Sequence, residues 1–196
     1  MPPLEWKEKG SYEWGLSCYL DEPGSDLAGC FADFVQDVLM EAVCEEINPL
    51  FVALGVDPDD PEQAPLEPVS FNPDPTHAQI GVSSWIEGVG VFDVCLEFTA
   101  LPAGQAGVEL VARYDADGWE PATVRRIRAA LFHEVGRKAQ FRLEEGEESL
   151  ALTTPFAAPS QALYRMAADM TAAFARAFQT VLGTNEDTAG DGRPGR

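Results

Sequence analysis

The first apolar stretch of the chain alternates between apolar and other residues. Residues 13, 15 and 17 are Glu, Gly and Ser. The positions around them are apolar: Tyr12, Trp14, Leu16, Cys18 and Leu20. A period of two places successive side chains on opposite faces of an extended chain. The pattern therefore predicts a half-buried β-strand over residues 12–20, followed by a turn at residues 21–24.

Three later segments have the period of an α-helix instead. The first begins after Ser25, a residue typical of helix N-caps, and we expect it to end near Ile47 because Pro49 disfavours helix before it. The other two cover residues 121–135 and 160–182, and a glycine follows each of them. All three carry apolar residues at spacings of three and four, which predicts helices packed on a core.

Short alternating segments predict the remaining strands. Apolar residues alternate around residues 80–86, 92–98 and 108–114, and the short connections between these segments predict an antiparallel meander. A hairpin is predicted over residues 139–152. Residues 56–76 hold six prolines among acidic residues, which indicates an extended loop.

Together these segments have the order β–α–β–β–β–α–β–β–α. The order predicts an α+β fold in which an antiparallel sheet of about five to six strands packs with three helices. We expect one domain over residues 11–183, a flexible N-terminus at residues 1–10 and a disordered tail at residues 184–196. The length of 196 residues and the hydrophobic content of 45% are sufficient for one core.

The formal net charge of -20 is unevenly distributed along the chain. Residues 10–112 contain 19 acidic residues and no Lys or Arg. Such a surface repels nucleic-acid phosphates and anionic membranes, so we expect neither direct nucleic-acid binding nor membrane binding. The expected partner is another protein with basic or apolar segments. The alternative is that the acidity only keeps the protein soluble.

Four acidic residues recur at every fourth position of the first predicted helix: Asp33, Asp37, Glu41 and Glu45. Like charges at this spacing destabilise a helix by about 0.2–0.5 kcal/mol per pair. We call these residues the acidic ridge and predict that a basic partner binds it. The alternative is a solvated face without a partner.

Basic residues gather later in the chain. Six of the 13 Lys and Arg lie between positions 125 and 142, where Glu134 is the only acidic residue. We call them the basic patch: Arg125, Arg126, Arg128, Arg137, Lys138 and Arg142. We predict that this patch takes part in self-association, for example by docking on the acidic half of a neighbouring copy.

No motif indicates a catalytic, metal or cofactor site. Neither the four well-separated cysteines nor the two histidines have the spacing of zinc ligands. Ser83 and Ser84 lack the glycines of a nucleophile elbow, although His77 is near in sequence. The acidic string DPDDPE lacks the glycine and distal glutamate of an EF-hand loop. We therefore expect a protein that is not an enzyme and needs no cofactor.

The expected location is the cytoplasm. No apolar run approaches the length of about 18 residues that spans a membrane. The start of the sequence, MPPLEWKEKG, lacks the apolar region of a signal peptide. The cysteines are expected to be reduced, as they are in that compartment.

From about Ser25 to Leu182 the chain resembles the class I type III secretion chaperones and the related YbjN-like proteins. The resemblance rests on acidity and on the order that remains without the first strand, α–β–β–β–α–β–β–α. The most similar stretches are ATVRRIRAALFHEVGR, KAQFRLEEGEESLAL and SQALYRMAADMTAAFARAFQTVL. The N-terminal strand and the proline-rich loop depart from the family pattern.

The resemblance implies a small acidic cytosolic protein that is usually dimeric. Such chaperones hold an unfolded segment of a secreted protein on apolar grooves and sheet edges. It also implies dimerisation around residues 124–141.

Two other kinds of protein fit the sequence. An acidic inhibitor or immunity protein would occlude a basic site on a toxin or nuclease, or mimic nucleic acid, and its affinity would fall steeply with salt. A subunit of a larger assembly would use the basic patch to contact its neighbours.

Overall fold

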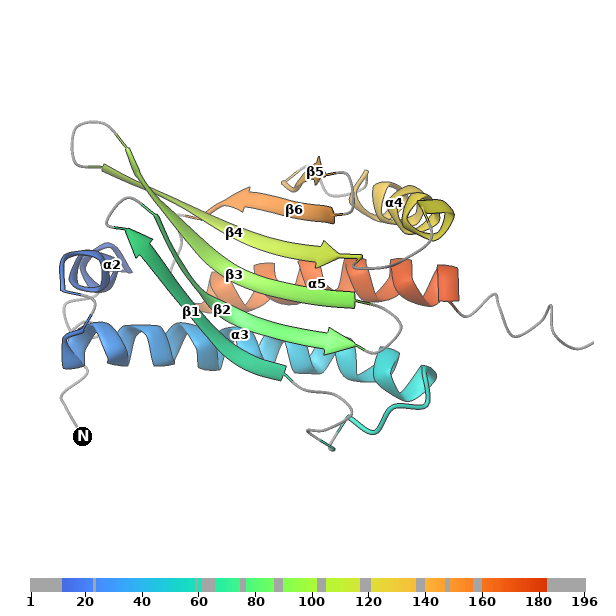
Figure 1. The fold of residues 1–196 in the computed structure, drawn as a ribbon, viewed down its shortest axis with the longest axis horizontal. Coiled ribbons are helices and arrows are strands. Elements are labelled where there is room, and N and C mark those ends of the chain that lie inside the picture. The colour runs from blue at the N-terminus through green and yellow to red at the C-terminus, as the bar shows by residue number, and fades with distance from the viewer. Residues whose placement is uncertain are drawn as a thin grey trace, which may run out of the picture.

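The computed structural model describes residues 12–22, 24–58, 60, 66–74, 77–86, 90–101, 105–116, 121–136, 140–146, 149–156 and 160–182. The predicted flexible N-terminus and disordered tail lie outside these residues. Within them the chain forms four helices and six strands (Figure 1). The elements are α2 (Tyr12–Asp21), α3 (Asp26–Ala53), β1 (Leu66–Asp74), β2 (His77–Ile86), β3 (Gly90–Leu101), β4 (Gln105–Asp115), α4 (Pro121–Val135), β5 (Arg142–Glu145), β6 (Ser149–Pro155) and α5 (Ser160–Leu182).

The strands form one antiparallel sheet in the order β1-β2-β3-β4-β6-β5. The α+β class and the antiparallel six-stranded sheet are therefore confirmed. The predicted order of elements is wrong in two places: the first element is a helix, and an unpredicted strand, β1, follows α3.

The predicted strand at residues 12–20 is helix α2. Over so short a stretch the apolar residues fit two periods, because Leu16, Tyr19 and Leu20 also have the spacing of one helical face. Leu16 and Tyr19 are buried against α3 and the sheet. The Tyr19 hydroxyl and the Ser70 hydroxyl of β1 are 2.7 Å apart, so a hydrogen bond ties α2 to the sheet. Tertiary packing thus selects the helix.

Helix α3 does not end before Pro49 but continues to Ala53. A proline inside a helix costs about 3 kcal/mol. Leu50 and Phe51, the two residues after it, are almost completely buried, and burial of such side chains contributes about 1.5–3 kcal/mol each. The packing of the last turn therefore offsets the cost of the proline.

Strand β1 lies inside the segment predicted as a proline-rich loop. It pairs with β2 through residues 66–71 and again at Asp74, with an irregular register between these points. It also contains Pro68 and Pro73. An edge strand tolerates proline because only one of its sides pairs with the sheet.

The helices cover one face of the sheet (Figure 1). Helices α3 and α5 contact the strands directly, α2 packs on α3, and α4 packs on α5. Side chains that alternate along β2, β3 and β4 point into this layer, and they include Ile80, Val94, Leu96 and Leu110. We call the opposite side the outer face; no helix among the described residues covers it.

Aromatic rings join α5 to the middle of the sheet. Phe92 of β3 and Tyr114 of β4 meet Phe174 and Phe178 of α5 with centroid distances between 4.9 and 6.4 Å. All four are completely or almost completely buried. Edge-to-face contacts of this kind add about 0.5–1.5 kcal/mol beyond the burial of area, so this cluster fixes α5 on the sheet.

No helix in the described part of the chain has the length and apolar character needed to cross a membrane.

Candidate functional site

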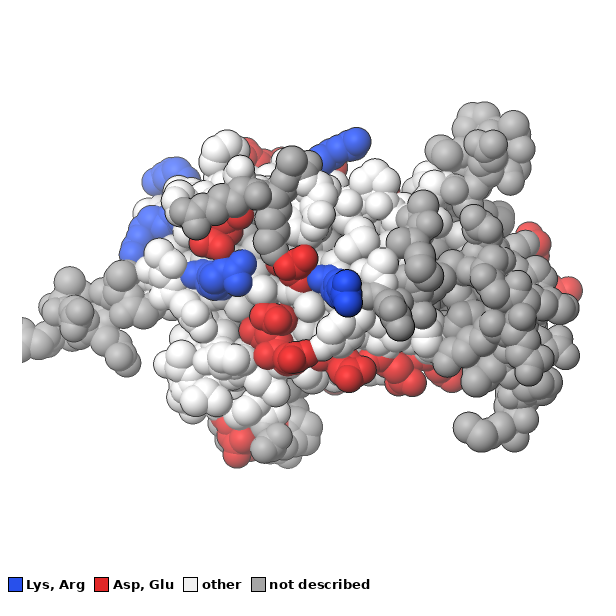
Figure 2. Space-filling model, turned by 180° about the vertical axis from the view of Figure 1, so that it is seen from behind, with Lys and Arg blue, Asp and Glu red and all other residues white. Residues whose placement is uncertain are grey.

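The acidic ridge lies along the solvent-facing side of α3. Asp33, Asp37, Glu41 and Glu45 are all exposed, and Figure 2 shows a row of acidic residues along this helix. Glu45 accepts a hydrogen bond from the Tyr164 hydroxyl of α5. This bond to a carboxylate raises the pKa of Tyr164 to about 12. The ridge is thus a continuous surface of one charge, anchored to α5 at its C-terminal end.

The other three carboxylates of the ridge have no cationic partner among the described residues. Ion pairs within that part of the chain include those of Arg113 with Glu97, Arg128 with Glu145 and Arg176 with Glu134, and none of them involves these three carboxylates. No cation among the described residues therefore offsets the repulsion between these like charges on α3.

The described members of the basic patch do not share one surface. Arg125, Arg126 and Arg128 are exposed on α4, and two of them have partners within the chain. Arg126 donates to the Val181 carbonyl oxygen at the end of α5 at 3.2 Å. Arg128 forms a 2.5 Å ion pair with Glu145. These contacts connect α4 to α5 and β5.

Arg142 lies on the other side of β5 from these arginines. Alternate residues of a strand point to opposite faces. Glu145 points toward α4, where it binds Arg128, so Arg142 points to the outer face. Arg137 and Lys138 lie outside the described residues.

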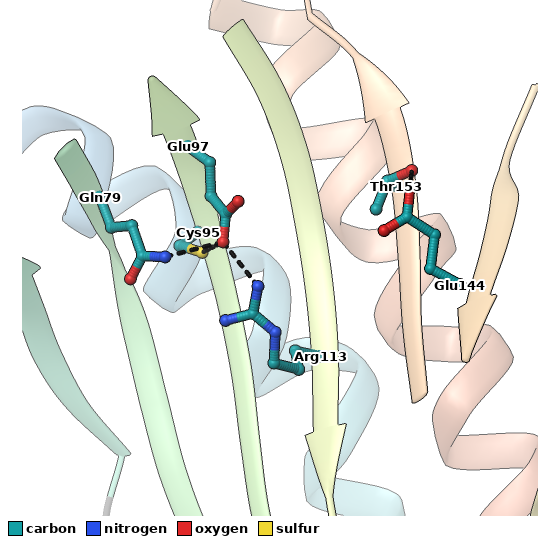
Figure 3. Close-up of polar contacts among 6 residues, drawn as sticks. All are labelled: Gln79, Cys95, Glu97, Arg113, Glu144 and Thr153. Atoms are coloured by element: carbon teal, nitrogen blue, oxygen red, sulfur yellow. Dashed lines mark hydrogen bonds and ion pairs between the residues drawn. The ribbon is translucent and has the colours of Figure 1, made fainter. Parts of the chain in front are cut away.

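The outer face carries a polar network that the sequence did not reveal (Figure 3). One carboxylate oxygen of Glu97, in β3, accepts from Gln79 Nε2 of β2 at 2.8 Å and from Arg113 Nη2 of β4 at 2.7 Å. The Cys95 thiol lies 3.9 Å from the same oxygen. Three adjacent strands are thus joined by side chains around one half-buried carboxylate.

Beneath this network runs a row of small side chains. Gly81, Cys95, Val111 and Thr153 are neighbours across β2, β3, β4 and β6, and all four are buried. A Cβ atom at Gly81 would lie 2.3 Å from the Val94 carbonyl oxygen, so only glycine fits there. Burial raises the pKa of the Cys95 thiol far above its ordinary value. This cysteine therefore stays a thiol and is a poor nucleophile.

A second polar pair continues the network along the face. Ser83 of β2 donates to Asp93 of β3, and Asp93 lies directly opposite Arg113 in the sheet. Burial raises the pKa of the Asp93 carboxyl, and the Ser83 hydrogen bond and the charge of Arg113 only partly oppose it. We call these five residues the outer-face network: Gln79, Ser83, Asp93, Glu97 and Arg113.

Two large aromatic side chains border the network. Phe71 of β1 lies opposite Gln79 and is 58% exposed. Trp85 of β2 lies two residues beyond Ser83 and is 55% exposed. Both positions belong to the outer face by register. An ordered polar surface with an exposed aromatic ring at each end is typical of a binding surface, since aromatic residues are enriched at protein interfaces.

The arrangement does not suggest nucleophilic catalysis. Ser83 donates to a carboxylate rather than to a histidine. His77 lies six residues away on the same strand, a distance of about 20 Å at the rise of an extended chain. In the described part of the chain no three His, Cys, Asp or Glu side chains are grouped as metal ligands would be.

Periodicity placed the acidic ridge on an exposed helix face, but it could not reveal the outer-face network. Network members come from three strands and meet only through the register of the sheet. The only available signal was the presence of polar residues at alternate positions of the predicted strands.

Comparison of the chain with protein-family profiles, with curated proteins and with solved structures gives no match.

Proposed function

We propose that this protein is a non-catalytic, chaperone-like binding module of the cytoplasm, which self-associates and holds a partner polypeptide. The observation that carries the proposal is the outer face. It is preorganised by the outer-face network, no described helix covers it, and Phe71 and Trp85 are exposed on it. Rigid aromatic side chains contribute large contact area at small entropic cost, and they often dominate binding energy.

The order of the elements supports the chaperone-like proposal. Without α2 and β1, the chain reads α3-β2-β3-β4-α4-β5-β6-α5. This is the α–β–β–β–α–β–β–α order that the resemblance to type III secretion chaperones implies. The additional elements α2 and β1 contact each other through Tyr19 and Ser70, so they extend this unit along the β1 edge.

A second candidate function rests on the acidic ridge. An inhibitor or immunity protein would use Asp33, Asp37, Glu41 and Glu45 to occlude a basic site on a toxin or nuclease. The exposure of all four residues favours this function. So does the lack of cationic partners for Asp33, Asp37 and Glu41 in the described part of the chain.

The decisive experiment compares two sets of substitutions. The tagged chain is used to purify its partner from the native cell, and binding of the identified partner is then measured with purified proteins. Phe71→Ala with Trp85→Ala should weaken the partner's affinity by about tenfold or more, as expected for exposed aromatic anchors. Replacement of the four ridge residues by Asn or Gln should change it little, and salt should have a weak effect.

The alternative function predicts the reverse pattern, in which the ridge variant loses the partner and affinity falls steeply with salt. Val52→Ala with Leu54→Ala is the matched control, because these apolar residues are also exposed but lie at the end of α3. If neither set exceeds this control, the outer face is not the binding surface.

A further inference from the structure

The outer face is acidic in the described part of the chain. The register of the sheet places six carboxylates on it: Glu67, Asp93, Glu97, Glu109, Asp115 and Glu144. Among the same described residues it places two guanidinium groups there, those of Arg113 and Arg142. A surface with such an excess of one sign attracts a partner of the opposite sign. Charge complementarity therefore favours a cationic group as the occupant of this face.

Four residues of the outer face gather at one end of β3. Trp85 of β2 and Asp115 of β4 lie opposite Val91 on its two sides, and Asp93 follows Val91 by two residues on the same face. Neighbouring strands lie about 4.8 Å apart, and diagonal neighbours lie about 7–8 Å apart. The charge of Asp115 accordingly contributes to the raised pKa of Asp93. We call Trp85, Val91, Asp93 and Asp115 the Trp85 corner.

The two carboxylates of the Trp85 corner have no cationic partner bound to them among the described residues. Arg113 lies directly opposite Asp93 in the sheet, but it donates to Glu97 at 2.7 Å, and Figure 3 shows its guanidinium group directed toward that carboxylate. Neither Asp93 nor Asp115 belongs to an ion pair within the described part of the chain. The Ser83 hydroxyl donates to one oxygen of Asp93, so the other oxygen can accept from a partner.

Trp85 and Val91 add an apolar surface beside these carboxylates. The Trp85 side chain is 55% exposed, and Val91 is half-buried. A planar guanidinium group stacks on an aromatic ring and donates to carboxylates in its own plane, whereas an ammonium group is a compact and strongly hydrated charge. The methylene stem of an arginine can in addition cover apolar surface. The combination of ring, aliphatic side chain and two carboxylates therefore fits arginine better than lysine.

We infer that the Trp85 corner binds an arginine side chain of the partner polypeptide, with the guanidinium group held between the Trp85 ring and the carboxylates of Asp93 and Asp115. This inference rests on the proposed function and names the chemistry that the outer face recognises. Asp93 is half-buried, and salt screens a partly buried ion pair less than an exposed one. The contact is therefore compatible with the weak salt dependence that we expect for partner binding.

The first test is an NMR titration of the isotope-labelled full chain with three peptides that differ in one side chain. They are Ac-Ala-Arg-Ala-NH2 and its lysine and citrulline analogues; citrulline has the shape of arginine without its charge. The indole N–H signal of Trp85, assigned with Trp85→Phe, reports binding. The arginine peptide should shift this signal saturably. The lysine peptide should bind about threefold or more weakly, and the citrulline peptide about tenfold or more weakly.

The second test repeats the titration with variants of the two carboxylates. Asp93→Asn and Asp115→Asn should each weaken binding of the arginine peptide by about threefold or more, because each removes one charged acceptor. Glu109→Gln is the matched control, since it removes the same charge from the outer face away from the Trp85 corner. It should change the affinity by less than about twofold. The amide spectrum of each variant verifies that the chain is folded.

Three outcomes would overturn the inference: no saturable shift with the arginine peptide, a lysine or citrulline peptide that binds as tightly, or carboxylate variants that lose no more than Glu109→Gln. The proposed function still stands after such a failure if Phe71→Ala with Trp85→Ala weakens binding of the captured partner. Conversely, failed partner capture leaves arginine binding standing, because the peptides are defined without the partner.

Discussion

Asp93 shows how one carboxyl on the outer face balances burial against hydrogen bonding. Ser83 donates to it and Arg113 lies opposite, yet burial still raises its pKa. A carboxyl with a raised folded-state pKa is less favourable in its ionised form in the fold than in the unfolded chain. Ionised Asp93 therefore lowers the stability of the fold at neutral pH, and this penalty disappears as the pH falls through the raised pKa.

Asp93→Asn should consequently increase the free energy of unfolding at neutral pH. Asn keeps an oxygen that can accept from Ser83 but carries no charge to desolvate. The gain should shrink as the pH is lowered through the raised pKa, and urea unfolding at several pH values measures it. Asp33→Asn, at an exposed position, is the control. A loss of stability at neutral pH would show that the charge pairing with Arg113 outweighs desolvation.

For single residues, the sequence predicted which side chains are exposed better than it predicted which side chains contact each other. The four-residue spacing of Asp33, Asp37, Glu41 and Glu45 correctly placed them on an exposed face of a helix. The contacts of Glu97 with Gln79 and Arg113 were not predictable, since they require the pairing of three strands. The same limit explains why Arg142 was grouped with the arginines of α4, although it points to the outer face.

Helix α2 shows how tertiary packing can determine the secondary structure of a short segment. Gly15 lies where α2 meets α3, and a Cβ atom there would approach Cδ2 of Phe31 to 2.5 Å. A side chain at this position would push the two helices apart.

Gly15→Ala should therefore destabilise the protein by about 1–3 kcal/mol, the usual cost of overpacking. Gly29→Ala in α3 is a matched control, because nothing lies within 4 Å of the added Cβ atom. It should stabilise the protein by about 0.5–1 kcal/mol through helix propensity. Urea denaturation of both variants checks the contrast. Equal effects would contradict the close packing of α2 on α3.

Long periodic elements were predicted well and short ambiguous ones were not. The second and third predicted helices match α4 and α5, and the meander matches β2, β3 and β4. The alternation at residues 12–20 was misleading because nine residues fit either period. β1 was missed because its prolines are typical of loops, and nothing local shows that a strand will lie at an edge.

The stability of the whole molecule depends on its net charge as well as on its packing. A net charge of -20 on 196 residues makes each folded copy repel itself. Added salt screens such repulsion between exposed charges.

Sodium chloride should therefore raise the urea midpoint of the unsubstituted chain. The variant with all four ridge residues neutralised has a net charge of -16, from -20 plus four, and should show a smaller rise. Unfolding curves at low and high salt measure both. An equal rise in the two proteins would indicate that the acidic ridge does not contribute to the repulsion.

The one-sided arrangement of the helices has a consequence for how this protein can change over evolution. The core lies between the helices and the inner side of the sheet, whereas Phe71, Trp85 and most of the outer-face network contribute little to it. Substitutions on the outer face can therefore alter what is recognised while folding is preserved. Gly81 is an exception, because the Val94 backbone leaves no room for a side chain at this position. One scaffold can thus diversify its specificity without having to be rebuilt.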